Sequence, residues 1–78
     1  MSETLLDVQG LICPLPVLKA NKALRGMAAG ARLTVLATDP ASVKDFPAFC
    51  QETGHDLVSF GESDGVYRFV LRKKAEPA

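Results

Sequence analysis

The sequence carries no excess charge of either sign, because nine lysine and arginine residues balance nine aspartate and glutamate residues. Proteins that bind nucleic acid through its phosphates need a basic surface, so no direct contact with nucleic acid is expected. No stretch approaches the roughly 20 apolar residues that cross a bilayer, and residues 1–4 lack the basic start and long apolar run of a secretion signal. We therefore expect a cytoplasmic protein with no membrane contact.

Cysteine and histidine are also scarce, which excludes several kinds of site. The chain has two cysteines, Cys13 and Cys50, and a single histidine, His55. These three residues cannot complete a closed zinc site, so no metal is expected. Position 16 is proline, so Cys13 has no partner in a Cys-x-x-Cys motif and dithiol redox chemistry is excluded. A disulfide between Cys13 and Cys50 is not expected in a reducing cytoplasm.

The composition is that of one small globular domain. The 78 residues are 47% hydrophobic, which is sufficient for a core without disulfide or metal staples. Alternating apolar residues predict strands at residues 4–8, 32–37, 56–61 and 66–73, and a turn around Ser63-Asp64-Gly65 joins the last two into a hairpin. We expect a single domain over residues 1–78 with a core over about 4–73, and fraying of about the last five residues.

Two helices are predicted between these strands. The first begins at Pro14 and is stopped by Gly30. Its buried stripe has spacings of three and four residues and is formed by Val17, Ala20, Leu24, Met27 and Ala28. The second helix has Asp39 as its N-cap and Gly54 as its C-terminal cap, and Pro47 is expected to kink or divide it.

The resulting order, βαβαββ, predicts an α/β fold that forms a two-layer sandwich. Two crossover helices imply parallel pairing among some or all of the first three strands, and right-handed connections place both helices on one face of the sheet. In the last strand Tyr67, Phe69 and Leu71 alternate with Arg68 and Arg72. This alternation predicts an aromatic face under the helices and an open, basic face toward solvent.

Cys13 is the main candidate for chemistry. It is expected at the N-cap of the first helix, with Pro14 in the first helical position and Pro16 two residues later. The positive end of the helix dipole would lower the pKa of a thiol placed there. The alternative is an inert cysteine that fills a gap in a loop, as many free cysteines do. The two prolines, which restrict the first turn, favour a reactive thiol.

The surroundings of Cys13 limit the kind of reaction. A cysteine hydrolase needs a base beside its nucleophile, but His55 follows the second helix and is expected to be exposed in a turn, away from Cys13. A lone activated cysteine without a base suits a covalent carrier that exchanges sulfur with other thiols. Cys50 follows Phe49 and lies one helical turn after Phe46, so it is interpreted as a buried structural residue.

One exposed face of the first helix is a candidate docking surface. It lies opposite the buried stripe and is formed by Leu15, Leu18, Lys19, Lys22 and Arg25. Two leucines and three cations near Cys13 suit a protein partner. The alternative is an ordinary basic helix face with two scattered leucines.

These residues resemble a known signature. The pattern Asp7-x-x-Gly10-x-x-Cys13-Pro14-x-Pro16 is similar to the opening motif of the TusA/SirA sulfur-carrier family. The resemblance extends over residues 5–73 and includes Asp39-Pro40-Ala41, Asp45-Phe46-Pro47 and Phe49-Cys50. It implies a four-stranded mixed sheet with two helices on one side. It also implies that Asp7 and Gly10 shape the loop before Cys13.

The resemblance further implies a function. Cys13 would receive sulfur as a persulfide from a cysteine desulfurase of the IscS type and pass it to a downstream acceptor, without any cofactor. In the family, the sulfur serves tRNA 2-thiouridine synthesis, molybdenum cofactor biosynthesis or sulfur oxidation. Position 15 is leucine here but acidic in some relatives, which leaves the acceptor open. Whether such a carrier acts as an enzyme also stays open.

Two other hypotheses remain. The chain could be a non-catalytic regulatory or protein-interaction module that uses the basic sheet face with Arg68 and Arg72. The other hypothesis is direct binding of RNA, and the neutral net charge argues against it.

Overall fold

The computed structural model describes residues 3–75; the final three residues, for which fraying is predicted, lie outside this range. The elements are β1 (Glu3–Asp7), α1 (Leu15–Arg25), β2 (Arg32–Ala37), α2 (Ser42–Thr53), β3 (Asp56–Ser63) and β4 (Val66–Arg72). This order confirms the βαβαββ prediction. Within the described residues, neither helix is long and apolar enough to cross a bilayer.

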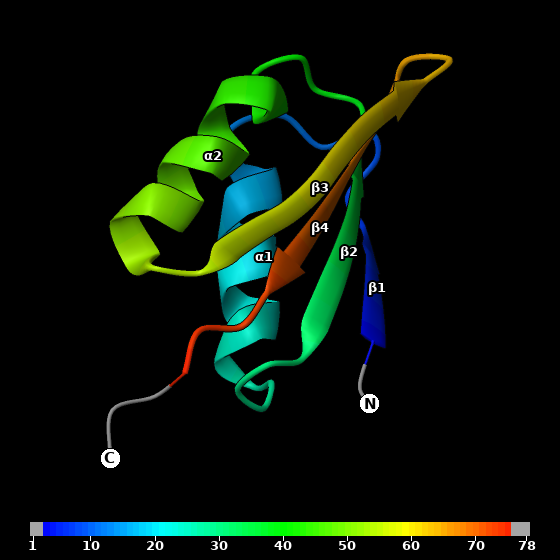
Figure 1. The fold of residues 1–78 in the computed structure, drawn as a ribbon. Helices are drawn as coiled ribbons and strands as arrows, with labels where there is room; N and C mark the ends of the chain where they lie inside the picture. Colours follow the sequence, from blue (N-terminus) through cyan, green and yellow to red (C-terminus); the bar gives the residue numbers. More distant parts are fainter. Residues whose placement is uncertain (1–2, 76–78) are drawn as a thin grey trace.

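The four strands form one mixed sheet in the order β1-β2-β4-β3. β1 pairs in parallel with β2, whereas β4 is antiparallel to both β2 and β3. Both helices cover the same face of the sheet (Figure 1), which confirms the two-layer α/β sandwich. Parallel pairing joins β1 and β2 but does not reach β3, because β4 is inserted between β2 and β3.

The core lies between the helices and the inner face of the sheet. Leu33, Val35 and Phe69 are fully buried there, and Phe46 of α2 stacks on Phe69 with ring centroids 4.6 Å apart. Burial of a side chain as large as phenylalanine stabilises the fold by about 2–3 kcal/mol. Arg68, on the opposite face of β4, is exposed. The alternation predicted from the sequence is therefore confirmed.

Local turn chemistry is also as predicted. Gly54 ends α2 in the left-handed conformation, with φ +88°, and its N–H donates to the Cys50 carbonyl over 2.8 Å. The hairpin between β3 and β4 turns at Asp64 and Gly65, which have φ of +52° and +81°. Two consecutive residues with positive φ match the right-handed twist of the paired strands.

Two helix boundaries differ from the predictions. α1 ends at Arg25 instead of near Gly30, because Gly26 caps it with an N–H that donates to the Ala23 carbonyl over 3.2 Å. Of the predicted stripe, Ala20 and Leu24 are buried and Val17 is partly buried, while Met27 and Ala28 follow the helix.

α2 begins at Ser42 with Ala41 at its N-cap, so Asp39 is not the cap. Pro47 lies inside α2 without dividing it. A proline removes one bond of the helix ladder, and the buried Phe46 and Cys50 on either side hold the helix against the core.

Candidate functional site

The loop that carries Cys13 lies beside the loop that follows β2. Because β1 and β2 are parallel neighbours, their carboxyl ends lie at the same edge of the sheet. The connection from β1 to α1 and the connection from β2 to α2 both start there (Figure 1). The Val8 N–H donates to the Leu36 carbonyl over 2.8 Å, and the Gly10 N–H donates to Thr38 Oγ1 over 2.9 Å. Ligands of open α/β sheets commonly bind at this kind of edge.

Asp7 and Gly10 lie at the start of the Cys13 loop. Asp7 Oδ1 accepts a hydrogen bond from the Gln9 N–H over 3.0 Å. Gly10 has φ +83°, and a Cβ added there would meet no atom within 4 Å. The backbone conformation therefore selects glycine at position 10, because other residues adopt this region with strain.

Cys13 lies one residue before the N-cap of α1, which is Pro14; the prediction that Cys13 is the N-cap is wrong. The peptide bond between the two residues is cis. Proline has no backbone N–H, so Leu15 is one of the few residues in the first turn of α1 that could donate to the thiol. Its N–H instead donates to the Ile12 carbonyl over 2.9 Å. The Cys13 N–H donates to Asp39 Oδ2 over 2.6 Å. The backbone of Cys13 is thus anchored while its side chain stays exposed.

The thiol opens into a groove between α1 and α2 with a volume of about 250 Å³. The residues of α2 that line the groove recur at spacings of three and four positions in sequence, so they lie on one face of the helix. The groove is lined by Cys13, Pro14, Val17, Asp45, Ala48, Phe49 and Glu52. Pro16, in the first turn of α1, is buried and is not among the residues that line the groove.

The electrostatics of Cys13 differ from the prediction. Its pKa is raised, first by a hydrogen bond to the Asp45 side chain, then by desolvation and by the negative charges of Asp45 and Asp39. A carboxylate beside a thiol favours the protonated form. The predicted lowering by the dipole of α1 is wrong because two aspartates from the other crossover connection face the sulfur. The parallel arrangement of residues 4–8 and 32–37 was the one sequence signal for this proximity.

Cys50 has the opposite surroundings. It is 5% exposed, and burial raises its pKa to about 11, with a smaller contribution from Asp56. Both cysteines are free thiols. In the part of the chain that the structure describes, no three His, Cys, Asp or Glu side chains gather into a group that could hold a metal.

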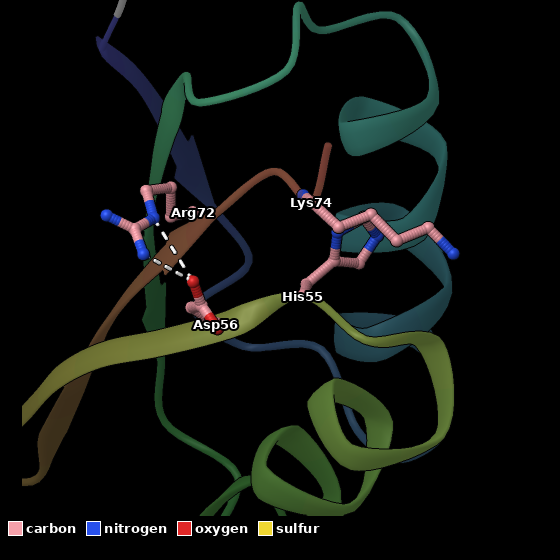
Figure 2. A network of polar contacts seen from close by, with 4 residues as sticks. All are labelled: His55, Asp56, Arg72 and Lys74. Atoms are coloured by element: carbon pink, nitrogen blue, oxygen red, sulfur yellow. Dashed lines mark hydrogen bonds and ion pairs between the residues drawn. The ribbon is translucent and has the colours of Figure 1, made fainter. Parts of the chain in front are cut away.

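His55 is buried, at 7% exposure, so the prediction that it is exposed is wrong. Figure 2 shows His55 covered by the chain at Lys74, whose N–H donates to His55 Nδ1 over 3.0 Å. A residue that follows a helix cap becomes buried when a distant segment packs over it. His55 does not line the groove beside Cys13.

The candidate docking residues share an exposed surface on α1. Leu15 and Leu18 are 42% and 55% exposed. Lys19, Lys22 and Arg25 are also exposed, and α1 contains no acidic residue. Another hollow, with a volume of about 340 Å³, lies between α1 and β1. It is lined by Leu6, Lys19, Lys22 and Ala23.

The basic outer face of the sheet is partly neutralised. Arg72 Nη2 and Nε both donate to Asp56 Oδ2, over 2.6 and 3.1 Å, between neighbouring strands (Figure 2). Both side chains are about half exposed, so the pair contributes little to stability. It nevertheless reduces the positive charge that an interaction module would use on this face.

Known proteins match almost the whole chain. The family model described as sulfurtransferase TusA matches residues 4–73. A Neisseria meningitidis serogroup A protein provisionally named a sulfur carrier is 53% identical over 74 residues, which cover 95% of this chain and 100% of the relative. The sulfur carrier protein TusA of Allochromatium vinosum is 50% identical over 68 residues, covering 87% and 90% of the two chains.

A solved structure gives the same picture of the fold. The SirA-like protein from Desulfitobacterium hafniense superposes with a TM-score of 0.81 at 29% identity. The match covers 91% of this chain and 97% of the other.

Proposed function

The chain belongs to the TusA sulfurtransferase family, and we propose that it is a sulfur carrier that holds sulfur as a persulfide on Cys13. The observation that carries the proposal is the exposed Cys13 thiol on an anchored backbone, at the end of a groove between two helices. Relatives named as sulfur carriers support the carrier role. Such a site can present a sulfur atom to one partner after another.

The transfer needs no cofactor and no change in the total oxidation state. The Cys13 thiolate attacks the outer sulfur of a donor persulfide; a new S–S bond forms on Cys13, the donor S–S bond breaks, and the donor thiolate leaves. In the second step an acceptor thiolate attacks the outer sulfur on Cys13 and releases the Cys13 thiolate. Sulfur and electrons balance in each step.

The donor in this proposal is a cysteine desulfurase of the IscS type, and the acceptor is a further sulfur-transfer protein in the cytoplasm. The destination of the sulfur would be tRNA 2-thiouridine, the molybdenum cofactor or sulfur oxidation. The carrier itself would make no direct contact with nucleic acid. The balanced net charge supports this, because phosphate binding favours basic proteins.

The intact mass of the protein after incubation with a desulfurase and free cysteine tests the proposal. We expect the wild type to gain one sulfur atom that a reductant removes. Cys13→Ser should gain none, and Cys50→Ala, which keeps the exposed thiol, should load normally. Equal loading of Cys13→Ser and the wild type would overturn the assignment. Cellular function retained by Cys13→Ser would favour the interaction module.

The α1 surface is the proposed docking site, because it joins two exposed leucines to three cations near the thiol. Reversing the charges of Lys19, Lys22 and Arg25 to glutamate should slow loading several-fold at low salt, and the difference should narrow as salt screens the charges. Arg68→Glu on the open sheet face is the control. Equal slowing by Arg68→Glu would place the contact elsewhere.

A further inference from the structure

The groove beside Cys13 has an acidic wall. Asp45 and Glu52 lie on the same face of α2, and none of the described residues that line the groove is a lysine, arginine or histidine. The basic residues of α1 lie on its exposed face, away from its buried stripe. The surroundings of the thiol therefore divide into an acidic groove and a basic flank.

Asp45 is the carboxylate placed to act on the sulfur. It lines the groove together with Cys13, and its side chain is the first cause of the raised pKa of the Cys13 thiol. The Asp45 backbone N–H donates to the Ala41 carbonyl over 2.9 Å, which fixes this residue in the first turn of α2. Asp39 is occupied differently, because its two oxygens accept the N–H groups of Cys13 and Ala41 over 2.6 and 3.3 Å. Glu52 is seven residues along the helix, about 10 Å from Asp45.

We propose that Asp45 is a positioning residue that holds the proton on the Cys13 thiol in the free carrier and gives it up when a partner inserts a cationic side chain into the groove. This extends the proposed function to its regulation. A lysine or arginine beside the Asp45 carboxylate cancels its negative charge, and the thiol proton passes to water through the open groove. The resulting thiolate can attack the outer sulfur of the donor.

The arrangement has a consequence for specificity. In the absence of a partner, the protonated thiol is a poor nucleophile, so the carrier resists reagents it meets by chance. A partner segment that is acidic near the thiol would meet Asp45, Glu52 and Asp39 and be repelled. The partner is therefore a protein whose reactive cysteine lies next to a lysine or arginine.

The pH dependence of alkylation tests the first half of the proposal. Iodoacetamide is used on a Cys50→Ala background, so that Cys13 is the only thiol. In Asp45→Asn the rate midpoint should move to lower pH, and at neutral pH the rate should rise about threefold. Asp45→Glu should restore slow alkylation, and Glu62→Gln, an exposed acid outside the groove, should change nothing. An unchanged midpoint in a folded Asp45→Asn variant would overturn the proposal.

Charged disulfides test the second half. Cystamine carries two ammonium groups, and dithiodiglycolate carries two carboxylates. We expect wild-type Cys13 to react several-fold faster with cystamine than with dithiodiglycolate. In Asp45→Asn the ratio of these two rates should fall toward one. An equal preference in the two proteins would overturn the role of the groove. Neither measurement depends on sulfur loading, so a carrier that fails to load would sink the proposed function while leaving the behaviour of Asp45 measurable.

Discussion

The two ends of the sandwich differ in the charge of the side chains that bind the backbone at the helix termini: a carboxylate at one end and two ammonium groups at the other. At the Cys13 end, where α1 and α2 begin, the Asp39 carboxylate accepts backbone N–H groups. At the other end, the Lys73 ammonium donates to the Leu24 carbonyl near the end of α1 over 2.7 Å. The Lys74 ammonium donates to the Thr53 carbonyl at the end of α2 over 2.6 Å. Each end thereby complements the dipoles of both helices.

The ends differ in exposure. Lys73 and His55 are each 7% exposed, and the chain at Lys74 covers His55 (Figure 2). Cys13 is exposed beside an open groove. The same electrostatic rule thus applies at a closed, buried end and at an open end that exposes the Cys13 thiol. Changes at the first should alter stability alone, while changes at the second should alter the chemistry of Cys13.

The largest effect on stability is expected from Lys73→Met. It removes a buried charged hydrogen bond to the Leu24 carbonyl, which should lower the free energy of unfolding by about 2 kcal/mol. Thermal denaturation followed by circular dichroism should show a Tm lower by roughly 10 °C, with the alkylation rate of Cys13 in the folded protein unchanged. Lys44→Met, at an exposed lysine of α2, is the control. Equal losses in both variants would contradict the division between the ends.

A smaller loss of stability, together with a change in chemistry, is expected from Asp39→Ala. The variant leaves the N–H groups of Cys13 and Ala41 without their carboxylate acceptor, which should cost about 1–2 kcal/mol. Loading with sulfur should also slow, because the backbone of Cys13 is no longer anchored. Asp39→Asn keeps one carbonyl oxygen and should be affected less. Normal loading by a folded Asp39→Ala would show that this anchor is unnecessary.

The third effect is absent at neutral pH, appears only in alkaline solution, and concerns Cys50. Its pKa is raised from 9.0 to about 11, mainly by burial. The folded state keeps this proton longer than the unfolded state, so the contribution to stability is complete below pH 9 and is lost as pH rises through about 11. Urea denaturation across this range should show a decline that is shallower in Cys50→Ala. Cys13→Ser should keep most of the decline, and an unchanged slope in Cys50→Ala would refute the assignment.

Much of the fold follows from local patterns. The alternation of Leu33 and Val35, and of Phe69 with Arg68, places the core face correctly. Gly54 ends α2 as predicted because a left-handed backbone favours glycine. Gly26 ends α1 four residues before the predicted stop at Gly30, because a glycine within an apolar helical pattern does not by itself mark a boundary.

The candidate site was predictable in part. The two prolines around position 15 single out Cys13 from the sequence. The groove and its acidic wall required the packing of α2 against α1, which brings Asp45 to a thiol 32 positions earlier in the chain. The position of Cys13 next to the first helix predicts that the helix dipole lowers its pKa. In the folded chain, the carboxylates of Asp45 and Asp39 instead raise the pKa of Cys13.

The sequence by itself determined the order of the elements, the faces of the strands, the turn at Asp64 and the identity of the reactive cysteine candidate. Each of these depends on backbone preferences or on periodicity within about ten residues. The tertiary structure decided the position of β4 between β2 and β3, the burial of His55 and the acidic surroundings of Cys13. These depend on contacts between distant segments, whose free energies arise only when the whole core packs.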